Sequence, residues 1–276
     1  LNLISEDLPE VSLAFDKTTI SEGDSAMITA TLSAASSQET IIKFTPSGTA
    51  TLNGDYSVDY EGKGAATTVA GGNGSGSAGN QLNFYVWYFA GVATDASGNV
   101  YVSDKANHRI QKWTPGATVG TTVAGGNGSG SGSNQFTYPN GMAVDASGNL
   151  YIADAGNDRV QKWAPGATEG ITVAGGNGRG GNANQLNKPA GIALDALGNV
   201  YIGDRENHRV QKWASGATEG VTVAGGNGSG SNANQLSYPF GVALDVSGNV
   251  YVVDESNHRI QKWAPGATEG ITVAGG

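Results

Sequence analysis

Short apolar runs alternate with turn-forming residues along most of the chain, in a pattern that repeats every fifty residues. The last copy contains four such runs, at 241–245 (GVALD), 249–254 (NVYVVD), 259–263 (RIQKW) and 271–276 (ITVAGG). These runs are rich in β-forming residues and are separated by Gly, Pro, Asn and Asp, so each predicts a β-strand. Four strands per repeat are typical of a β-propeller blade, and a fixed period of this length decides the architecture.

The repeats predict a propeller domain over residues 63–276. Its four copies lie at about 73–126, 127–176, 177–226 and 227–276. Residues 67–72 (TTVAGG) match the last strand of a blade although no blade precedes them, so we expect an extra outer strand there. The prediction is therefore an all-β fold of four four-stranded blades. Three arrangements remain open: a compact four-bladed closure, an open arc from a longer protein, or an arc completed by another chain.

Residues 1–62 lack the fifty-residue period and predict a different, smaller module. Three runs in it alternate like strands or are rich in β-formers, at 11–15, 26–32 and 39–44. Gly, Ser and Pro punctuate these runs, which favours a small antiparallel segment of the β-sandwich type. A half-sandwich would leave open strand edges, and such edges invite pairing with another chain.

The sequence of this module resembles part of a Calx-beta module. The matching segments are 7–13 (DLPEVSL), 20–24 (ISEGD) and 48–56 (GTATLNGDY). Some members of that family bind calcium, and the resemblance places Glu22 at a ligand position, whereas Ser47 stands where an acid is expected. Calcium needs six to eight oxygen ligands. We therefore expect no cofactor, with Ca²⁺ as the alternative.

The repeated segments follow the pattern GVA-x-D-x-x-GN-x-Y-x-x-D-x-x-NHR-[IV]-QKW, and TVAGGNG loops join them. This sequence pattern, over residues 67–276, resembles the NHL repeats of bacterial surface and secreted proteins. The resemblance implies an extracellular or cell-surface location. The sequence begins without Met or an apolar signal core, which favours a fragment of a longer bacterial protein.

Three positions recur in phase and have structural explanations. An Asp ends the second strand, an Arg follows five residues later, and a Trp follows the QK pair. These residues are Asp104, Arg109, Trp113, Asp154, Arg159, Trp163, Asp204, Arg209, Trp213, Asp254, Arg259 and Trp263. We expect the Asp and Arg to form an ion pair within each blade and the Trp to pack against the next blade.

His108, His208 and His258 occupy one repeated slot, in which the second copy has Asp158. Three histidines can bind zinc, but rotation between blades carries equivalent slots apart, which favours a turn or packing role. The sequence shows no lone His among the repeats, no Ser-His-Asp arrangement and no isolated acidic pair. We therefore assign no metal or catalytic residue and expect no enzyme, with a lyase-like propeller enzyme as the disfavoured alternative.

Positions that break the repeat are the candidates for ligand or partner binding. The first copy carries a longer, aromatic approach at 83–89, and the other departures lie on or near the loops. The candidates are Tyr85, Trp87, Tyr88, Arg179, Lys188, Arg205, Glu206 and Glu255. The alternatives are that the aromatic residues cover the junction with the N-terminal module and that the charged residues are simply solvated.

Composition narrows the class of function. The net charge is −9, and the basic residues are spread over the repeats, which excludes a basic face for nucleic acid. The chain has no cysteine and no apolar run long enough for a membrane helix. The favoured function is a non-enzymatic scaffold or adhesion module at the cell surface that binds protein or glycan through the propeller loops. The second hypothesis is a structural subunit that self-assembles by strand exchange.

Overall fold

The computed structural model describes residues 11–15, 28–32, 68–84 and 90–276. The chain divides into two compact units, residues 1–64 and 65–276. In the first, β1 (Val11–Phe15) pairs antiparallel with β2 (Ile28–Leu32), with Val11 opposite Leu32. The third strand predicted at 39–44, and the positions Glu22 and Ser47, lie outside the described residues.

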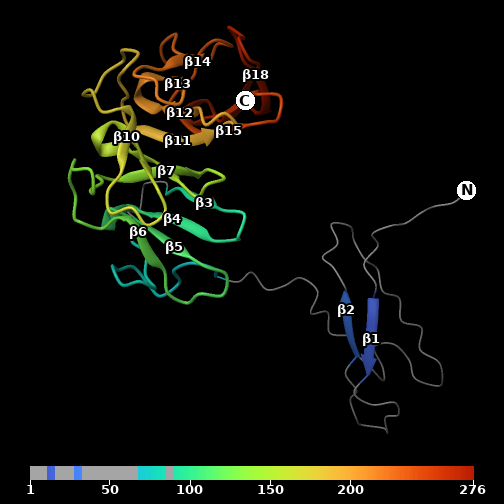
Figure 1. Ribbon diagram of the computed structural model, residues 1–276. Coiled ribbons are helices and arrows are strands. Elements are labelled where there is room, and N and C mark those ends of the chain that lie inside the picture. The colour runs from blue at the N-terminus through green and yellow to red at the C-terminus, as the bar shows by residue number, and fades with distance from the viewer. Residues whose placement is uncertain (1–10, 16–27, 33–67, 85–89) are drawn as a thin grey trace, which may run out of the picture. The chain divides into compact units, whose positions relative to one another are not determined.

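The second unit consists of four blades, each a four-stranded antiparallel sheet with its strands in chain order (Figure 1). The strands of blade 1 are β3 (Val92–Thr94), β4 (Val100–Asp104), β5 (Arg109–Trp113) and β6 (Thr121–Gly125); those of blade 2 are β7 (Pro139–Val144), β8 (Leu150–Asp154), β9 (Arg159–Trp163) and β10 (Ile171–Gly175); those of blade 3 are β11 (Pro189–Leu194), β12 (Val200–Asp204), β13 (Arg209–Trp213) and β14 (Val221–Gly225); and those of blade 4 are β15 (Pro239–Leu244), β16 (Val250–Asp254), β17 (Arg259–Trp263) and β18 (Ile271–Gly275). A single 3-10 turn follows the second strand of each blade: η1 (Lys105–Asn107), η2 (Ala155–Asn157), η3 (Arg205–Asn207) and η4 (Glu255–Asn257). The all-β propeller architecture predicted from the fifty-residue period is confirmed.

A tight turn joins the first and second strands of every blade. In blade 1 the Asp95 carboxylate accepts the backbone N–H groups of Ser97 and Asn99, and also the Tyr101 hydroxyl at 2.9 Å. Gly98 adopts φ 75°, a region that disfavours residues with a Cβ atom. The turn predicted from Asp-Ala-Ser-Gly is therefore present, and its Asp also anchors the Tyr of the following strand.

The apolar core lies between consecutive blades. Tyr101, Ile110 and Ala124 of blade 1 cluster with residues of blade 2, including Trp163. Corresponding clusters bring Trp213 against blade 2 and Trp263 against blade 3. Each of these Trp residues therefore packs against the preceding blade, and the prediction that it packs against the next blade is wrong. The sequence period alone does not encode which neighbouring blade the Trp contacts.

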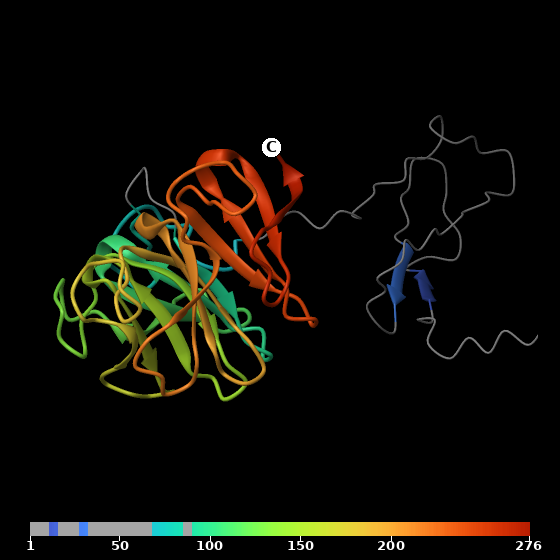
Figure 2. The ribbon, with the colours of Figure 1, turned by 90° about the horizontal axis from the view of Figure 1, so that it is seen from above.

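The three inter-blade clusters join blade 1 to 2, 2 to 3 and 3 to 4, and among the described residues none joins blade 4 to blade 1. Figure 2 shows the blades following one another to the red fourth blade, whose outer side carries no further sheet. The prediction of an extra outer strand at 67–72 is wrong, because residues 68–72 form no strand. Strand structure requires a hydrogen-bonded partner, and the equivalent residues 122–126 follow a blade that supplies one.

Candidate functional site

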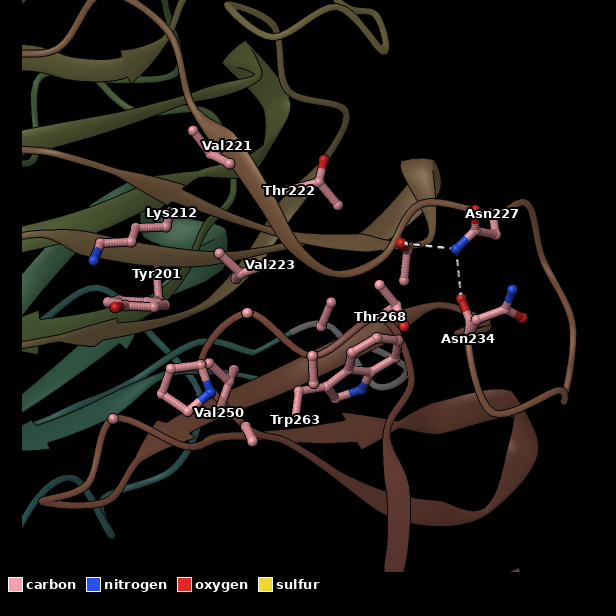
Figure 3. A pocket seen from close by; sticks show the side chains of 17 residues that line it. Tyr201, Lys212, Val221, Thr222, Val223, Asn227, Asn234, Val250, Trp263 and Thr268 are labelled. Atoms are coloured by element: carbon pink, nitrogen blue, oxygen red, sulfur yellow. Dashed lines mark hydrogen bonds between the residues drawn. The ribbon is translucent and has the colours of Figure 1, made fainter.

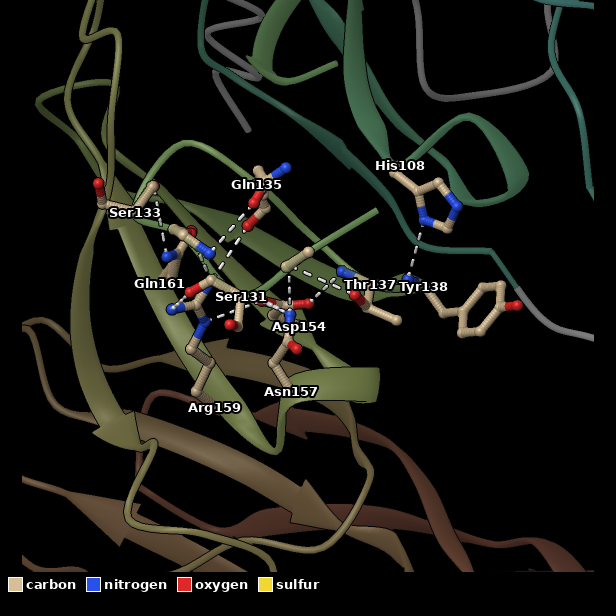
Figure 4. Close-up of polar contacts among 12 residues, drawn as sticks. His108, Ser131, Ser133, Gln135, Thr137, Tyr138, Asp154, Asn157, Arg159 and Gln161 are labelled. Atoms are coloured by element: carbon tan, nitrogen blue, oxygen red, sulfur yellow. Dashed lines mark hydrogen bonds and ion pairs between the residues drawn. The ribbon is translucent and has the colours of Figure 1, made fainter. Parts of the chain in front are cut away.

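One end of each blade is built by a recurring cluster of Asp, Asn and Arg, shown for blade 2 in Figure 4. In blade 2 the buried Asp154 carboxylate accepts the Thr137 backbone N–H, the Asn157 side-chain amide and the Arg159 guanidinium, the last at 2.8 Å. Arg159 also donates to the carbonyl oxygens of Ser131 and two neighbouring loop residues. The cluster therefore ties the Gly-rich loop, the 3-10 turn and the third strand together.

The same Asp–Arg pair occurs in all four blades, as the sequence predicts. Its nitrogen–oxygen distances are 2.6, 2.8, 2.7 and 2.7 Å for the pairs Asp104–Arg109, Asp154–Arg159, Asp204–Arg209 and Asp254–Arg259. Burial raises the pKa of Asp154, and the hydrogen bonds from Asn157, Thr137 and Arg159 oppose that rise. These residues are consequently structural: they fix the loops on which a binding site can be displayed.

The slot of the three histidines links consecutive blades. His108, Asp158 and His208 all adopt left-handed backbone with φ near 50°. Their side chains accept the backbone N–H of a residue in the next blade, as His108 Nδ1 does from Tyr138 at 3.4 Å and Asp158 does from Lys188 at 2.9 Å. The predicted packing role is thus confirmed for these residues. His258, in the last blade, has an exposed side chain.

Four of the residues that break the repeat form one ionic network at this end. Arg205 binds Glu206 at 3.2 Å and Glu255 of the next blade at 3.1 Å. Lys188 forms a second ion pair with Glu206, at 3.3 Å. The Arg205 guanidinium also lies over the ring of Tyr238, 4.9 Å from its centroid. Residues from three strands' ends in blades 3 and 4 therefore converge on one surface, which we call the axial network.

Arg179 joins this network through blade 2. Its guanidinium forms an ion pair with Asp158 at 3.0 Å, and Asp158 in turn accepts the Lys188 backbone N–H. In the third and fourth blades the corresponding loop position is occupied by Arg179 and Ser229, and only the Arg faces an Asp in the histidine slot. The departures Asp158, Arg179 and Lys188 are therefore compensating changes at one junction.

Lys105 adds a further charged residue at the repeat position of Arg205 and Glu255, and it was not among the candidates predicted from the sequence. It lies in the first blade and is buried. Burial, together with the nearby charge of Arg205, lowers its pKa from the ordinary value to about 8. The signal in the sequence was the variation Lys, Ala, Arg, Glu at one repeated position.

The axial network offers several kinds of contact to a ligand. Arg205, Glu206 and Glu255 are each about a quarter to a third exposed, so their polar ends reach solvent while their stems are packed. Tyr238 supplies an aromatic ring beside Arg205, and this ring also contacts His208. Guanidinium and carboxylate groups can hydrogen-bond hydroxyl or amide groups, and Tyr rings can pack on the flat faces of sugars or peptides.

A separate groove of about 770 Å³ lies between blades 3 and 4 (Figure 3). Tyr201, Lys212 and Val221 form the wall from blade 3, and Trp263 and Pro265 form the wall from blade 4. Lys212 lies 5.3 Å from the Tyr201 ring centroid. None of the predicted binding residues lines this groove, so the axial network is the stronger candidate site.

The three aromatic candidates Tyr85, Trp87 and Tyr88 lie outside the described residues. In the part of the chain that the structure describes, no group of three or more His, Cys, Asp or Glu residues is placed to hold a metal ion. The helices found there are all too short to cross a membrane.

Comparison with protein families now identifies the repeat. Segments 90–113, 136–163, 186–213 and 236–263 match the family model described as the NHL repeat. The chain carries four NHL repeats. Each matched segment of the last three begins at the buried apolar residue that precedes the inner strand and ends at the Trp, so the repeat contains the first three strands of each blade.

Solved structures share the fold of this chain. A protein of unknown function from Bacteroides thetaiotaomicron matches with TM-score 0.53 and 22% identity over 63% of this chain. An auxiliary nutrient binding protein from the same organism matches with TM-score 0.50 and 16% identity over 62% of the chain. A gluconolactonase from Xanthomonas campestris matches with TM-score 0.50 and 17% identity over 66% of the chain.

These matches show the fold alone, since their identities are 22%, 16% and 17%. The chain spans 46% of each Bacteroides structure and 60% of the gluconolactonase. No curated protein is similar enough in sequence to count as a match.

Proposed function

We propose that this NHL chain is a non-enzymatic scaffold or adhesion module, extracellular or at the cell surface, that binds a protein or glycan through the axial network. The observation that supports this most directly is that residues from different loops meet in one connected set of ion pairs. These residues are Lys188, Arg205, Glu206 and Glu255, which were selected only because they break the repeat.

Stability should depend little on this network. The Asp–Asn–Arg clusters already hold the loops in every blade, whereas the axial ion pairs are partly exposed and occur once. Partly exposed ion pairs add little to folding free energy. Residues that vary at an otherwise uniform position, and that place charge and aromatic surface on a rigid scaffold, are better explained by recognition.

The fold itself does not choose between binding and catalysis, since solved structures with this fold include a nutrient binding protein and a gluconolactonase. A catalytic centre needs a base or nucleophile within hydrogen-bond reach of the reacting atoms. Here His108 and His208 use Nδ1 to accept a backbone N–H of the next blade. This engagement of the histidines supports a binding role.

The test uses a printed glycan array and a displayed random peptide library as probes. The wild-type chain is compared with the variant Arg205→Ala, Glu255→Ala and with the control Glu219→Ala, an exposed acid in the turn at the opposite end of blade 3. We expect ligands that bind wild type and control alike and lose at least about tenfold in affinity for the double variant. Ligands that bind all three proteins equally, or turnover of a bound glycan, would contradict the proposal.

A further inference from the structure

The outer side of blade 4 exposes apolar residues that are buried in every earlier blade. Ile110, Val160 and Val210 are fully buried, whereas the equivalent Ile260 is partly exposed. Ala124, Ala174 and Ala224 are buried, whereas Ala274 is exposed. Val253, at 39% exposure, and Val273, at 47%, extend the same surface. We call the surface formed by Tyr251, Val253, Ile260, Val273 and Ala274 the C-face.

The contacts between consecutive blades show which residues cover the equivalent face of blades 1 to 3. In blade 1 the equivalent residues Tyr101, Ile110 and Ala124 are covered by the next blade. The covering residues are Phe136, Met142, Leu150, Ile152 and Trp163. The same arrangement recurs between blades 2 and 3 and between blades 3 and 4. A C-face is therefore complementary to the side of an NHL blade that carries its Trp.

Blade 1 exposes part of that complementary side. Val92 pairs with Val102 as Met142 pairs with Ile152, so Val92 and Met142 are equivalent. Val92 is 65% exposed, whereas Met142 is 6% exposed. Leu82 is also partly exposed, whereas its equivalents Phe136, Leu186 and Leu236 are fully buried. Val102 and Trp113 of the same side are already buried in blade 1. The exposed part, which we call the N-face, is therefore limited to the surface around Leu82 and Val92.

We propose that two copies of this chain associate head to tail, with the C-face of each covered by the N-face of the other. The contact continues an interface that the chain already forms three times between its own blades. Heterologous contacts of this kind produce closed rings when the rotation closes. Propellers contain about four to eight blades, and two copies with four blades each give a ring within that range, whereas three copies do not.

One position limits how tightly the copies pack. Val253 stands where blades 1 to 3 have Ser103, Ala153 and Gly203. A Cβ atom at Gly203 would lie 2.9 Å from the carbonyl oxygen of Phe240 in the next blade, so space at this position is small. The side chain of Val253 must therefore adjust to the incoming blade. Val253→Ala restores the residue of blade 2 and should favour association.

The test is sedimentation velocity of the full chain over a wide range of concentration. We expect the wild-type protein to shift from monomer to dimer as concentration rises, and Val253→Ala to shift at lower concentration. Ile260→Asp should raise the dissociation constant about a hundredfold, because docking would bury an unpaired carboxylate. The matched control is Val246→Asp, at a fully exposed position of the same blade outside the C-face. It should dimerise like wild type.

A second variant tests the orientation. Val92→Asp changes only the N-face, so a head-to-tail contact predicts that it also weakens the dimer. A mixture of Val92→Asp and Ile260→Asp retains one intact C-face and one intact N-face, and it should associate more strongly than either variant alone. A wild-type protein that stays monomeric at all concentrations would overturn the proposal. So would a dimer that Val92→Asp leaves unchanged, since that result indicates contact between two C-faces.

Discussion

Arg205 of the third blade binds Glu255 of the fourth, with 3.1 Å between Arg205 Nη2 and Glu255 Oε2. The two residues stand at the same position of consecutive repeats, where the first two copies have Lys105 and Ala155. The contact therefore joins the equivalent 3-10 turns η3 and η4 of two neighbouring blades. A single repeated position therefore builds much of the axial network, and its variation from copy to copy gives the network its charges.

The Arg205–Glu255 pair should contribute little to stability. A double-mutant cycle of Arg205→Ala and Glu255→Ala, followed by denaturant unfolding, is expected to give a coupling free energy below about 1 kcal/mol, because both side chains are about a third exposed. A coupling of several kcal/mol would assign the network to folding and weaken the argument that it serves recognition.

The buried Asp154 should behave in the opposite way. Asp154→Ala leaves the Arg159 guanidinium without its carboxylate and the Thr137 N–H without its acceptor. We expect a loss of about 3–5 kcal/mol in the free energy of unfolding, the range for removing one partner of a buried ion pair. The control Glu219→Ala changes an exposed acid and should stay within about 0.5 kcal/mol of wild type. A comparable small loss for Asp154→Ala would refute the structural role of the cluster.

The junction between blades 1 and 2 should weaken in mild acid. Burial lowers the pKa of His108 from 6.5, so the folded state disfavours the protonated ring, which could not accept the Tyr138 N–H. The stabilising contribution is therefore full above about pH 6.5 and is lost as the pH falls toward the lower folded pKa. Denaturant unfolding at several pH values measures this loss.

His108→Asp supplies the control for that pH dependence. Blade 2 already has Asp158 at this position, where the carboxylate accepts the Lys188 N–H at 2.9 Å. The variant should fold and should show a flatter dependence of stability on pH through the histidine range. An unchanged dependence in His108→Asp would mean that His108 is not the titrating group.

The turn Asp residues should stabilise the blades down to lower pH. Hydrogen bonds from Asn99 lower the pKa of Asp95 from 3.8 to about 2. This contribution is full above the ordinary pKa and is lost as the pH falls through the folded value. Asp95→Asn should therefore be less stable than wild type near neutral pH, and the difference should shrink as the pH approaches about 2. A difference that is constant with pH would contradict the assignment.

Much of the fold was predictable because the same turn and strand residues recur in every repeat. The Asp-Ala-Ser-Gly turn, the Asp104–Arg109 type of ion pair and the strand order all follow from local sequence and from the period. The side on which Trp163 packs was predicted wrongly, because the period does not specify which neighbour a strand contacts. The extra strand at 67–72 was also wrong, since a strand-like sequence forms no strand without a partner.

The candidate site was predictable only in part. Comparing copies selected Arg179, Lys188, Arg205, Glu206 and Glu255, because a uniform repeat makes each departure visible. The sequence could not show that these residues touch, since Lys188 and Glu206 lie on different loops and Arg205 and Glu255 on different blades. Lys105 and Tyr238 were missed because the burial of Lys105 and the packing of Arg205 over the Tyr238 ring depend on the folded structure.

The central claim is that the axial network binds a ligand. The most direct measurement is hydrogen–deuterium exchange of the wild-type chain with and without a glycan or peptide selected in the binding screen. Bound ligand should protect the backbone around Lys188, Arg205 and Tyr238 and leave the turns at the opposite end, such as 214–220, unchanged. Protection confined to those turns or to the groove lined by Trp263 and Val221, with none at the axial network, would contradict the account.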